Sequence, residues 1–569
     1  MTLSRRELLL GSVGLAAAGC ATASNGDGAG SESVDAADPA QSSEATAASP
    51  TVTSPTAGAQ VDVLPTLVDA PEYSGLAPFA LGVASGDPDA ESVVLWTRLI
   101  TNHEEFEPIS EVDMEVALDV ALDEGFEELV SSRLTNAPAQ HGHSIHEIVS
   151  DLDPDTWYFY RFRTGEHASP IGRTRTLPSQ TAEDIPTLRF GFSSCQNWES
   201  GSYGAHRRLV EEDLDLFVWL GDYIYEYGPG NSRDVASLGQ RVHNSPEVTT
   251  LSGYRARYAL YKSDPALQAH HATRPWVVTW DDHEVDNNHA GFASEDDQDQ
   301  AEFASRRSAA YQAWWENMPV RVDPPNDQRA FVIYRSIEWG SLCHLHMLDG
   351  RQFRSPQPTD GEPVILPGVG DLGVRQLSDT ARDPSTSMLG ADQRRWLENQ
   401  VAASNAAWNV LGNQVYMHGL NAFPGEVASV NTDTWDGYFG ERQALLESIG
   451  GPDQNLVVLS GDFHSSTAAD VRSNPYDLDG PIMATEFMAP PISSTFPEQL
   501  RSLAPLVLGL NPQVRNFSPD NGYMTCEVTE EVWTTRLHLL ADVADSDSAA
   551  SVAMEFAVVA GQAGISSIR

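Results

Sequence analysis

Residues 456–464 read LVVLSGDFH, and this stretch decides the fold that we expect. An apolar run ends abruptly in a polar cluster with Asp462 and His464, the pattern of a buried strand whose end carries functional groups. Helical patterns such as residues 301–317 separate this run from others of its kind. Buried strands that alternate with helices predict a layered α/β domain, which we place at residues 181–569. Three further apolar runs end in polar clusters in the same way, at residues 188–192, 216–220 and 276–280.

The stretch from residue 71 to 180 has a different pattern. Short runs of strand type, such as residues 157–162, are separated by turn signals such as Gly86-Asp87-Pro88. Strands at this spacing predict a small all-β sandwich domain of the immunoglobulin or fibronectin type, which precedes the α/β domain. At the other end of the chain, the last forty residues read as the closing strands of the α/β domain.

The first twenty residues, 1–20, read as an export signal. Arg5 and Arg6 precede a short apolar run, well below the ~20 residues of a membrane-spanning helix. The paired arginines followed by Leu-Leu resemble the signal of the Tat route, which exports folded proteins. Cys20 closes a segment that resembles a lipoprotein cleavage box and would be lipidated there. Plain signal-peptidase cleavage after residue 23 is the alternative.

Residues 21–70 are rich in Ala, Ser, Thr, Gly and Asp and lack aromatic side chains, which predicts a disordered tether. We therefore expect an extracytoplasmic protein that uses the Tat machinery and touches the membrane only through a lipid anchor, or is otherwise periplasmic or secreted. Cys195, Cys343 and Cys526 allow at most one disulfide, and the last two lie in strand-like runs typical of buried thiols.

The charge of the chain excludes a general nucleic-acid-binding surface. Its 569 residues include 81 acidic and 34 basic side chains, a formal net charge of −47, whereas binding to phosphate backbones needs a basic face. Lys262 is the only lysine. An acid-rich, lysine-poor composition favours adaptation to concentrated salt, where charge is screened within about 3 Å at 1 M. Drift in a GC-rich genome, which replaces Lys codons by Arg codons, is the alternative.

The polar clusters, taken in order, resemble a known superfamily. In the calcineurin-like metallophosphoesterases, a strand-end ligand is followed by Gly-Asp, then by Asn/Asp-His-Glu/Asp and then by Gly-His/Asp-x-His, and the clusters of this chain stand in a similar order. The versions at residues 194–196, 221–226, 280–284 and 461–464 resemble the alkaline phosphatase D (PhoD-like) family. Further blocks that match this family stand at residues 254–268, 348–354, 388–397, 412–415, 435–438 and 522–529.

The resemblance implies a pair of metal ions, Fe3+ and Ca2+. The iron would be bound by Cys195, Asp222, Tyr225 and His464, a mixture of soft and hard donors that suits iron better than zinc or magnesium. The second ion would be bound by Asp222, Asp282 and Asp462, an all-oxygen set that suits a hard cation such as calcium. Mn2+ or Zn2+ remains the alternative.

The resemblance also implies an exported alkaline phosphatase and phosphodiesterase, in which a metal-activated hydroxide attacks phosphate mono- and diesters. His283, with Asn288 or its neighbour Asn287, would contact the phosphate or the leaving group. The candidate phosphate clamps are Arg255, Arg257 and Arg351, for each of which a salt bridge to a carboxylate is the alternative. Two other functions stay open, an enzyme resembling purple acid phosphatase and a surface lipoprotein whose inactive phosphoesterase domain serves for binding.

Overall fold

The computed structural model describes residues 78–100, 111–230, 241–326, 331–366 and 370–569. All described residues belong to one compact unit of the chain, Val63–Arg569. The export signal and Cys20, the tether at 21–70, and residues 71–77 of the expected sandwich lie outside the described residues. No helix in the described ranges is long and apolar enough to cross a membrane.

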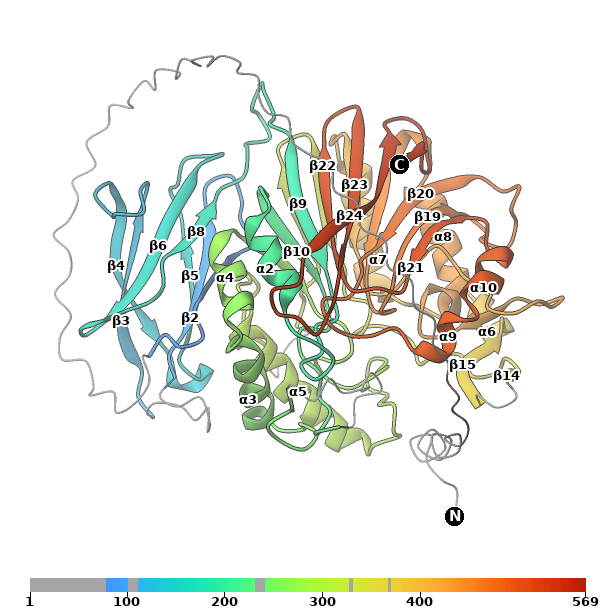
Figure 1. Ribbon diagram of the computed structural model, residues 1–569, viewed down its shortest axis with the longest axis horizontal. Coiled ribbons are helices and arrows are strands. Elements are labelled where there is room, and N and C mark those ends of the chain that lie inside the picture. The colour runs from blue at the N-terminus through green and yellow to red at the C-terminus, as the bar shows by residue number, and fades with distance from the viewer. Residues whose placement is uncertain (1–77, 101–110, 231–240, 327–330, 367–369) are drawn as a thin grey trace, which may run out of the picture. The chain divides into compact units, whose positions relative to one another are not determined.

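Two sheets form the centre of the α/β region (Figure 1). In the first, three parallel strands are continued by antiparallel strands from the C-terminal end of the chain, as expected for closing strands. The parallel strands are β9 (Leu188–Ser193), β10 (Leu216–Leu220) and β11 (Trp276–Thr279). The C-terminal strands are β22 (Gly522–Val528), β23 (Val532–Leu540), β24 (Ala550–Val559) and β25 (Ser567–Ile568).

The second sheet has four parallel strands at its centre and antiparallel strands at its edges. The parallel strands are β13 (Cys343–Met347), β16 (Trp408–Gly412), β18 (Leu456–Ser460) and β20 (Ile482–Met488). The antiparallel strands are β12 (Arg335–Trp339), β19 (Ser466–Arg472) and β21 (Val514–Ser518). A small third sheet contains β14 (Pro363–Leu366), β15 (Gly370–Gln376) and β17 (Ser429–Asn431).

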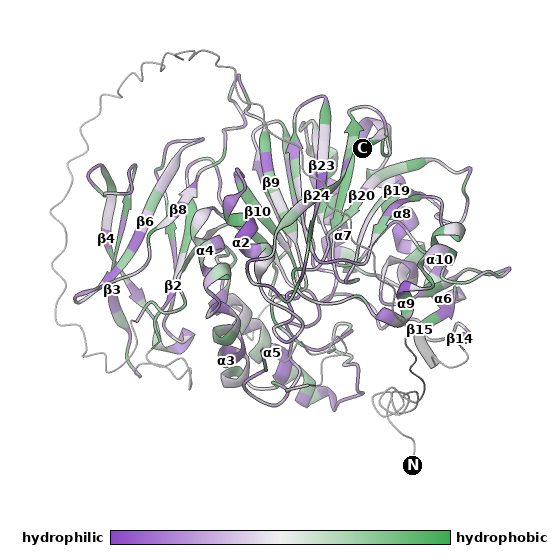
Figure 2. Ribbon diagram, viewed as in Figure 1, coloured by the Kyte–Doolittle hydropathy of each residue, from purple (hydrophilic) through white to green (hydrophobic). Residues whose placement is uncertain are grey.

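The two large sheets pack face to face and helices cover their outer faces, so that four layers result. Phe190 and Val218 of the first sheet belong to the same buried cluster as Val457 and Phe487 of the second, and Figure 2 shows how hydrophobic residues concentrate on the central strands. The first sheet is covered by α2 (Gly204–Glu211), α3 (Leu251–Lys262), α4 (Pro265–Thr273) and α5 (Gln300–Asn317). The second is covered by α7 (Gly390–Ala403) and α8 (Phe439–Ile449). This is the layered sandwich that the strand pattern predicts.

The N-terminal region is an all-β sandwich, as predicted, with its own buried core. One of its sheets contains β3 (Met114–Ala121), β4 (Leu129–Ala137), β6 (Trp157–Thr164), β7 (His167–Ala168) and β8 (Gly172–Arg175). The facing strands are β1 (Val83–Gly86), β2 (Val93–Arg98) and β5 (Ser144–Val149). They continue the first large sheet of the α/β region, because Gly86 of β1 pairs with Trp276 of β11. The sandwich therefore shares a sheet with the α/β region.

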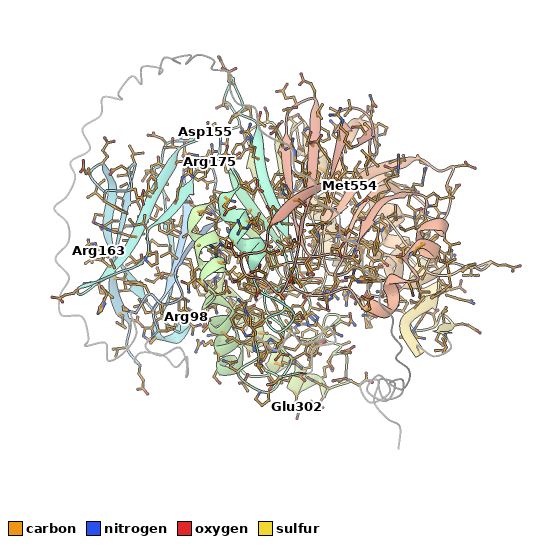
Figure 3. The ribbon with its side chains drawn as sticks, in the orientation of Figure 1. Arg98, Asp155, Arg163, Arg175, Glu302 and Met554 are labelled. Carbon is orange, nitrogen blue, oxygen red and sulfur yellow. The ribbon has the colours of Figure 1, made fainter. Side chains whose placement is uncertain are left out.

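Buried polar contacts reinforce this shared sheet. The guanidinium of Arg98 on β2 donates to the Gly142 carbonyl at 2.9 Å and to Asn317 Oδ1 at the end of α5 at 3.4 Å. Arg175 on β8 forms an ion pair with Asp155 within the sandwich (Figure 3) and another with Asp215, directly before β10. Because these side chains join the sandwich to the α/β region, we expect the two regions to unfold as one unit.

Candidate metal centre

The carboxyl ends of four parallel strands from the two sheets deliver the predicted ligands to one place. Cys195 follows β9, Asp222 follows β10, Asp282 follows β11, and Asp462 and His464 follow β18. The donor atoms form three groups, and within each group all atoms lie within 4.8 Å of one another. The groups are Cys195 with Asp222 and His464, Asp222 with Asp282 and His283, and Asp281 with Asp282 and Asp462. The groups overlap through Asp222 and Asp282, as two neighbouring metal positions would.

The first group is extended by Tyr225, the fourth predicted iron ligand. Its hydroxyl donates to Asp222 Oδ2 at 2.9 Å and lies 3.0 Å from His464 Nε2. Ser494 Oγ donates to the same phenol oxygen at 2.8 Å, and the sulfur of Cys195 lies 3.1 Å from Ser194 Oγ. The structure thus brings all four predicted iron ligands together.

Arg351 supplies a positive counter-charge to the third group, Asp281 with Asp282 and Asp462. Its guanidinium forms ion pairs with Asp281 and with Asp433, the latter at 2.9 Å. It also lies 3.6 Å from Asp282 Oδ2 and 3.4 Å from Asp462 Oδ1. Arg351 is fully buried. Because its positive charge lies among these carboxylates, it neutralises part of their negative charge at this end of the site.

The backbone holds these ligands in an unusual conformation. Cys195, Asp222, Asp462 and His464 have φ angles of 56°, 58°, 67° and 49°, in the left-handed region that ordinary side chains avoid. Such strain costs of order 1–3 kcal/mol per residue and typically marks functional sites. The chain therefore turns sharply after β9, β10 and β18, at the residues that carry these ligands.

Glycine is required before one of these ligands. A Cβ atom at Gly221 would lie 2.4 Å from Asp281 Cβ, and the φ angle of Gly221 is +105°. The Gly-Asp motif therefore has a steric reason, the close approach of the strand ends.

Burial and crowding set the electrostatics of the site. Burial, together with Asp222, raises the pKa of the Cys195 thiol well above its usual value. Burial and neighbouring carboxylates likewise raise the pKa of Asp222 and Asp462. For Asp282, burial is outweighed by Arg351 and His283, which lower the pKa of its carboxyl. A bound cation would relieve this crowding of acidic groups, because it favours their ionised forms.

The residues present fit a pair of cations. Asp222 Oδ1 is buried and finds no hydrogen-bond partner among the described residues, and the same holds for Asp281 Oδ2. Buried carboxylate oxygens are seldom left without a partner unless an ion or water satisfies them. With a thiol, a phenol, an imidazole and several carboxylates, the donor set is suited to a transition metal beside a harder ion.

His283 lies beside the first group of donor atoms, and the carboxylate of Glu226 holds its imidazole in place. Its Nδ1 is 2.8 Å from Glu226 Oε2, and its ring packs on that of Tyr225 with centroids 4.1 Å apart. Burial alone would lower the pKa of His283, but Glu226, Asp222 and Asp282 together raise this pKa well above its usual value.

The two asparagines that follow His283 differ in their contacts. The backbone N–H of Asn288 donates to Asp282 Oδ2 at 2.6 Å, and its carbonyl accepts from Arg354 at 3.1 Å. The side-chain Nδ2 of Asn287 is buried without a hydrogen-bond partner among the described residues. Asn287 is therefore the stronger candidate for a substrate contact, although Asn288 also lies at the site.

The three predicted phosphate clamps lie in different surroundings. Arg351 contacts the side chains of predicted ligands. Arg255 pairs with buried Glu316 at 2.5 Å, and the guanidinium of Arg257 donates to the backbone carbonyls of Tyr225 and Tyr227. These contacts favour structural roles for Arg255 and Arg257, so their role as phosphate clamps stays a prediction that the geometry does not support.

Several residues of the site were not singled out from the sequence. Glu284 accepts the backbone N–H groups of Asp222, Tyr223 and Asp281 at 3.1, 2.6 and 2.9 Å, and thereby ties two ligand loops together. Glu226 and Glu284 each close one of the quoted motifs, which was the available signal. Asp433 stands 82 residues from its partner Arg351, and no spacing in the sequence indicates that contact.

Cys195, Cys343 and Cys526 are free thiols, and all three are buried. Cys343 and Cys526 belong to the core between the two large sheets, which confirms the prediction of buried thiols.

Comparison with known proteins agrees with this geometry. The family model described as "PhoD-like phosphatase" matches residues 190–537, and the model of its N-terminal domain matches residues 66–178. The chain is 38% identical to alkaline phosphatase D of Bacillus subtilis (strain 168) over 499 residues, 87% of this chain and 83% of the relative. A solved structure of PhoD aligns with a TM-score of 0.81 and 37% identity over 87% of this chain and 93% of the other. Purple acid phosphatase PPD1 from yellow lupin shares the fold, with a TM-score of 0.50 and 11% identity over 84% of this chain and 74% of the other.

Proposed function

We propose, because this chain belongs to the PhoD-like phosphatase family and is a phosphoric ester hydrolase, that it hydrolyses both phosphate monoesters and diesters at alkaline pH with two metal ions. The observation that carries the proposal is the convergence of Cys195, Asp222, Tyr225 and His464, where Asp222 Oδ1 is buried without a hydrogen-bond partner among the described residues. We further propose that the protein is exported by the Tat route and lipidated at Cys20, as its first twenty residues suggest.

Two sets of residues would hold the ions. Cys195, Asp222, Tyr225 and His464 would bind iron, and Asp222, Asp282 and Asp462 would bind calcium, with Asp222 common to both. When bound, the ions would supply Lewis-acid chemistry that withdraws negative charge from the phosphate. The thiol and phenol of the first set suit iron, and the all-carboxylate second set suits a hard cation.

The chain's own groups would orient the substrate and move the proton. The Glu226 carboxylate accepts a hydrogen bond from His283 Nδ1–H, so the imidazole is held in one orientation with Nε2 available. His283 Nε2 would donate a hydrogen bond to the phosphate or a proton to the leaving alcohol. Asn287 Nδ2 has no partner among the described residues and would bind a phosphate oxygen.

The rival functions receive less support. An enzyme of the purple acid phosphatase type is expected to have Asp and His where Cys195 and Asp462 stand. An inactive binding domain is expected to have lost at least one ligand, whereas every predicted ligand here is present and lies at the site.

The test uses Asp222→Asn with Asp392→Asn as its matched control, because Asp392 is exposed on α7. The export-matured parent protein should release nitrophenol from both p-nitrophenyl phosphate and bis(p-nitrophenyl) phosphate in high salt at alkaline pH. We expect Asp222→Asn to reduce kcat at least about 100-fold and to lose metal, since it removes the shared carboxylate. A parent protein that hydrolyses neither ester, or an Asp222→Asn variant of unchanged activity, would contradict the proposal.

A further inference from the structure

An apolar cavity of about 140 Å³ is lined in part by Phe463, a residue of one of the loops that carry the predicted ligands. One wall is formed by α9 (Glu498–Arg501), α10 (Ala504–Leu510) and the turn between them, and strands β19, β20 and β21 supply others. These elements neighbour one another in Figure 1. The lining is largely aromatic and aliphatic and includes Tyr416, Phe463, Phe496, Phe517, Leu503 and Val507.

The cavity is continuous with the ligand loops along the chain. Phe463, which lines it, stands between the predicted ligands Asp462 and His464. Phe496 follows two residues after Ser494, whose hydroxyl donates to Tyr225. The ring of Phe463 packs against those of Tyr416 and Phe496, with centroids 5.3 and 6.1 Å apart. A group in this cavity would therefore lie beside the metal centre.

Three lining residues, Tyr416, His418 and Thr467, carry a buried polar atom without a hydrogen-bond partner among the described residues. His418 is fully buried; its Nδ1 lies 2.7 Å from Glu486 Oε2, and its Nε2 has no hydrogen-bond partner among the described residues. Thr467 is 2% exposed, and its Oγ1 also lacks a partner in the described part of the chain. These atoms are covered by neighbouring side chains, so the surface that the cavity presents to a ligand is apolar.

We infer that this cavity binds the alcohol part of the substrate, and that this part is an aromatic ring. The inference rests on the proposed function and adds the substrate class, aryl phosphate esters, to it. A cavity of about 150 Å³ lined by apolar side chains accommodates benzene, and aromatic walls favour a flat ring in offset or edge-on contact.

The test compares phenyl phosphate, which carries the ring, with glycerol 2-phosphate, which does not. Val507→Phe reduces the cavity, whereas Leu506→Phe changes the neighbouring residue, which is 48% exposed and does not line it. We expect Val507→Phe to lower kcat/KM for phenyl phosphate at least 10-fold and for glycerol 2-phosphate less than 2-fold, because a pocket discriminates by 10-fold or more for small changes in apolar fit. Leu506→Phe should change neither.

Enlarging the cavity gives an independent variant should Val507→Phe fold poorly. In Val507→Ala, the ratio of kcat/KM for 1-naphthyl phosphate to that for phenyl phosphate should rise several-fold over that of the parent protein. Equal losses with both esters in Val507→Phe, or an unchanged ratio in Val507→Ala, would overturn the inference and leave the proposed function standing. A parent protein that hydrolyses neither phenyl phosphate nor glycerol 2-phosphate would overturn both.

Discussion

Glu226 and His283 form a buried pair in which the Oε2 atom of the carboxylate lies 2.8 Å from Nδ1 of the imidazole. Burial raises the pKa of Glu226, but His283 outweighs it and lowers that pKa below its usual value, so the carboxylate is charged. Glu226 also accepts the Asn287 backbone N–H at 3.0 Å. One carboxylate therefore fixes both the imidazole and the loop that carries the candidate substrate contact.

Replacing this carboxylate tests its positioning role. In Glu226→Gln we expect kcat to fall 10- to 100-fold, the usual effect of losing a group that orients a site residue. KM should change little, because Glu226 is not expected to touch the substrate. Glu302→Gln is the matched control, since Glu302 is exposed on α5 (Figure 3). A change in KM alone, with kcat retained, would contradict the positioning role.

Arg255 offers a test between a structural role and a phosphate clamp. Its partner Glu316 is fully buried, so Arg255→Ala leaves an unpaired buried carboxylate and should lower the free energy of unfolding by about 3–5 kcal/mol. The control Arg207→Ala removes an exposed pair with Asp547 and should cost below about 1 kcal/mol. Denaturant unfolding and steady-state kinetics check both variants. A rise in KM without loss of stability would restore the phosphate clamp.

Lys262 makes the stability of the protein depend on pH. Burial lowers the pKa of this lysine to about 7, and its ammonium lies 4.2 Å from the centre of the Trp96 ring. Between pH 7 and the unfolded value of about 10.4, the unfolded chain binds more protons at this group. Its contribution to the free energy of unfolding therefore rises with pH across that window.

The variant Lys262→Met should remove this contribution. We expect it to be more stable than the parent protein at pH 7, and the advantage to shrink as pH approaches 10, by an amount on the order of 4 kcal/mol at most. Denaturant unfolding at several pH values measures the difference. If the two curves stay parallel from pH 7 to 10, the lysine is charged in the folded state and this account of it is wrong.

The strands and the order of the ligands could be predicted because both are local in sequence. The apolar run at 216–220 coincides with β10, and the helical pattern at 301–317 lies within α5. The motifs place each ligand two to five residues after a strand, where the chain has little freedom to direct it elsewhere. Most of the candidate site could therefore be predicted from local sequence patterns.

Long-range partners could not be predicted. Arg255 meets Glu316 61 residues later, and in a chain with 81 acidic residues no spacing selects one carboxylate among many. The pairing of Gly86 with Trp276, which joins the sandwich to the catalytic sheet, is likewise a contact between distant segments. The apolar cavity depends on side chains from many elements and has no signature in any one stretch.

The most direct test of the central claim measures iron, calcium and diester hydrolysis together in the parent protein, Cys195→Ala and Cys526→Ala. Cys526 is the control because it is a buried free thiol in the core between the sheets. The account predicts iron and bis(p-nitrophenyl) phosphate hydrolysis in the parent protein and in Cys526→Ala, and the loss of both in folded Cys195→Ala. Iron that remains at parental levels in Cys195→Ala would contradict the assignment of this thiol as a metal ligand.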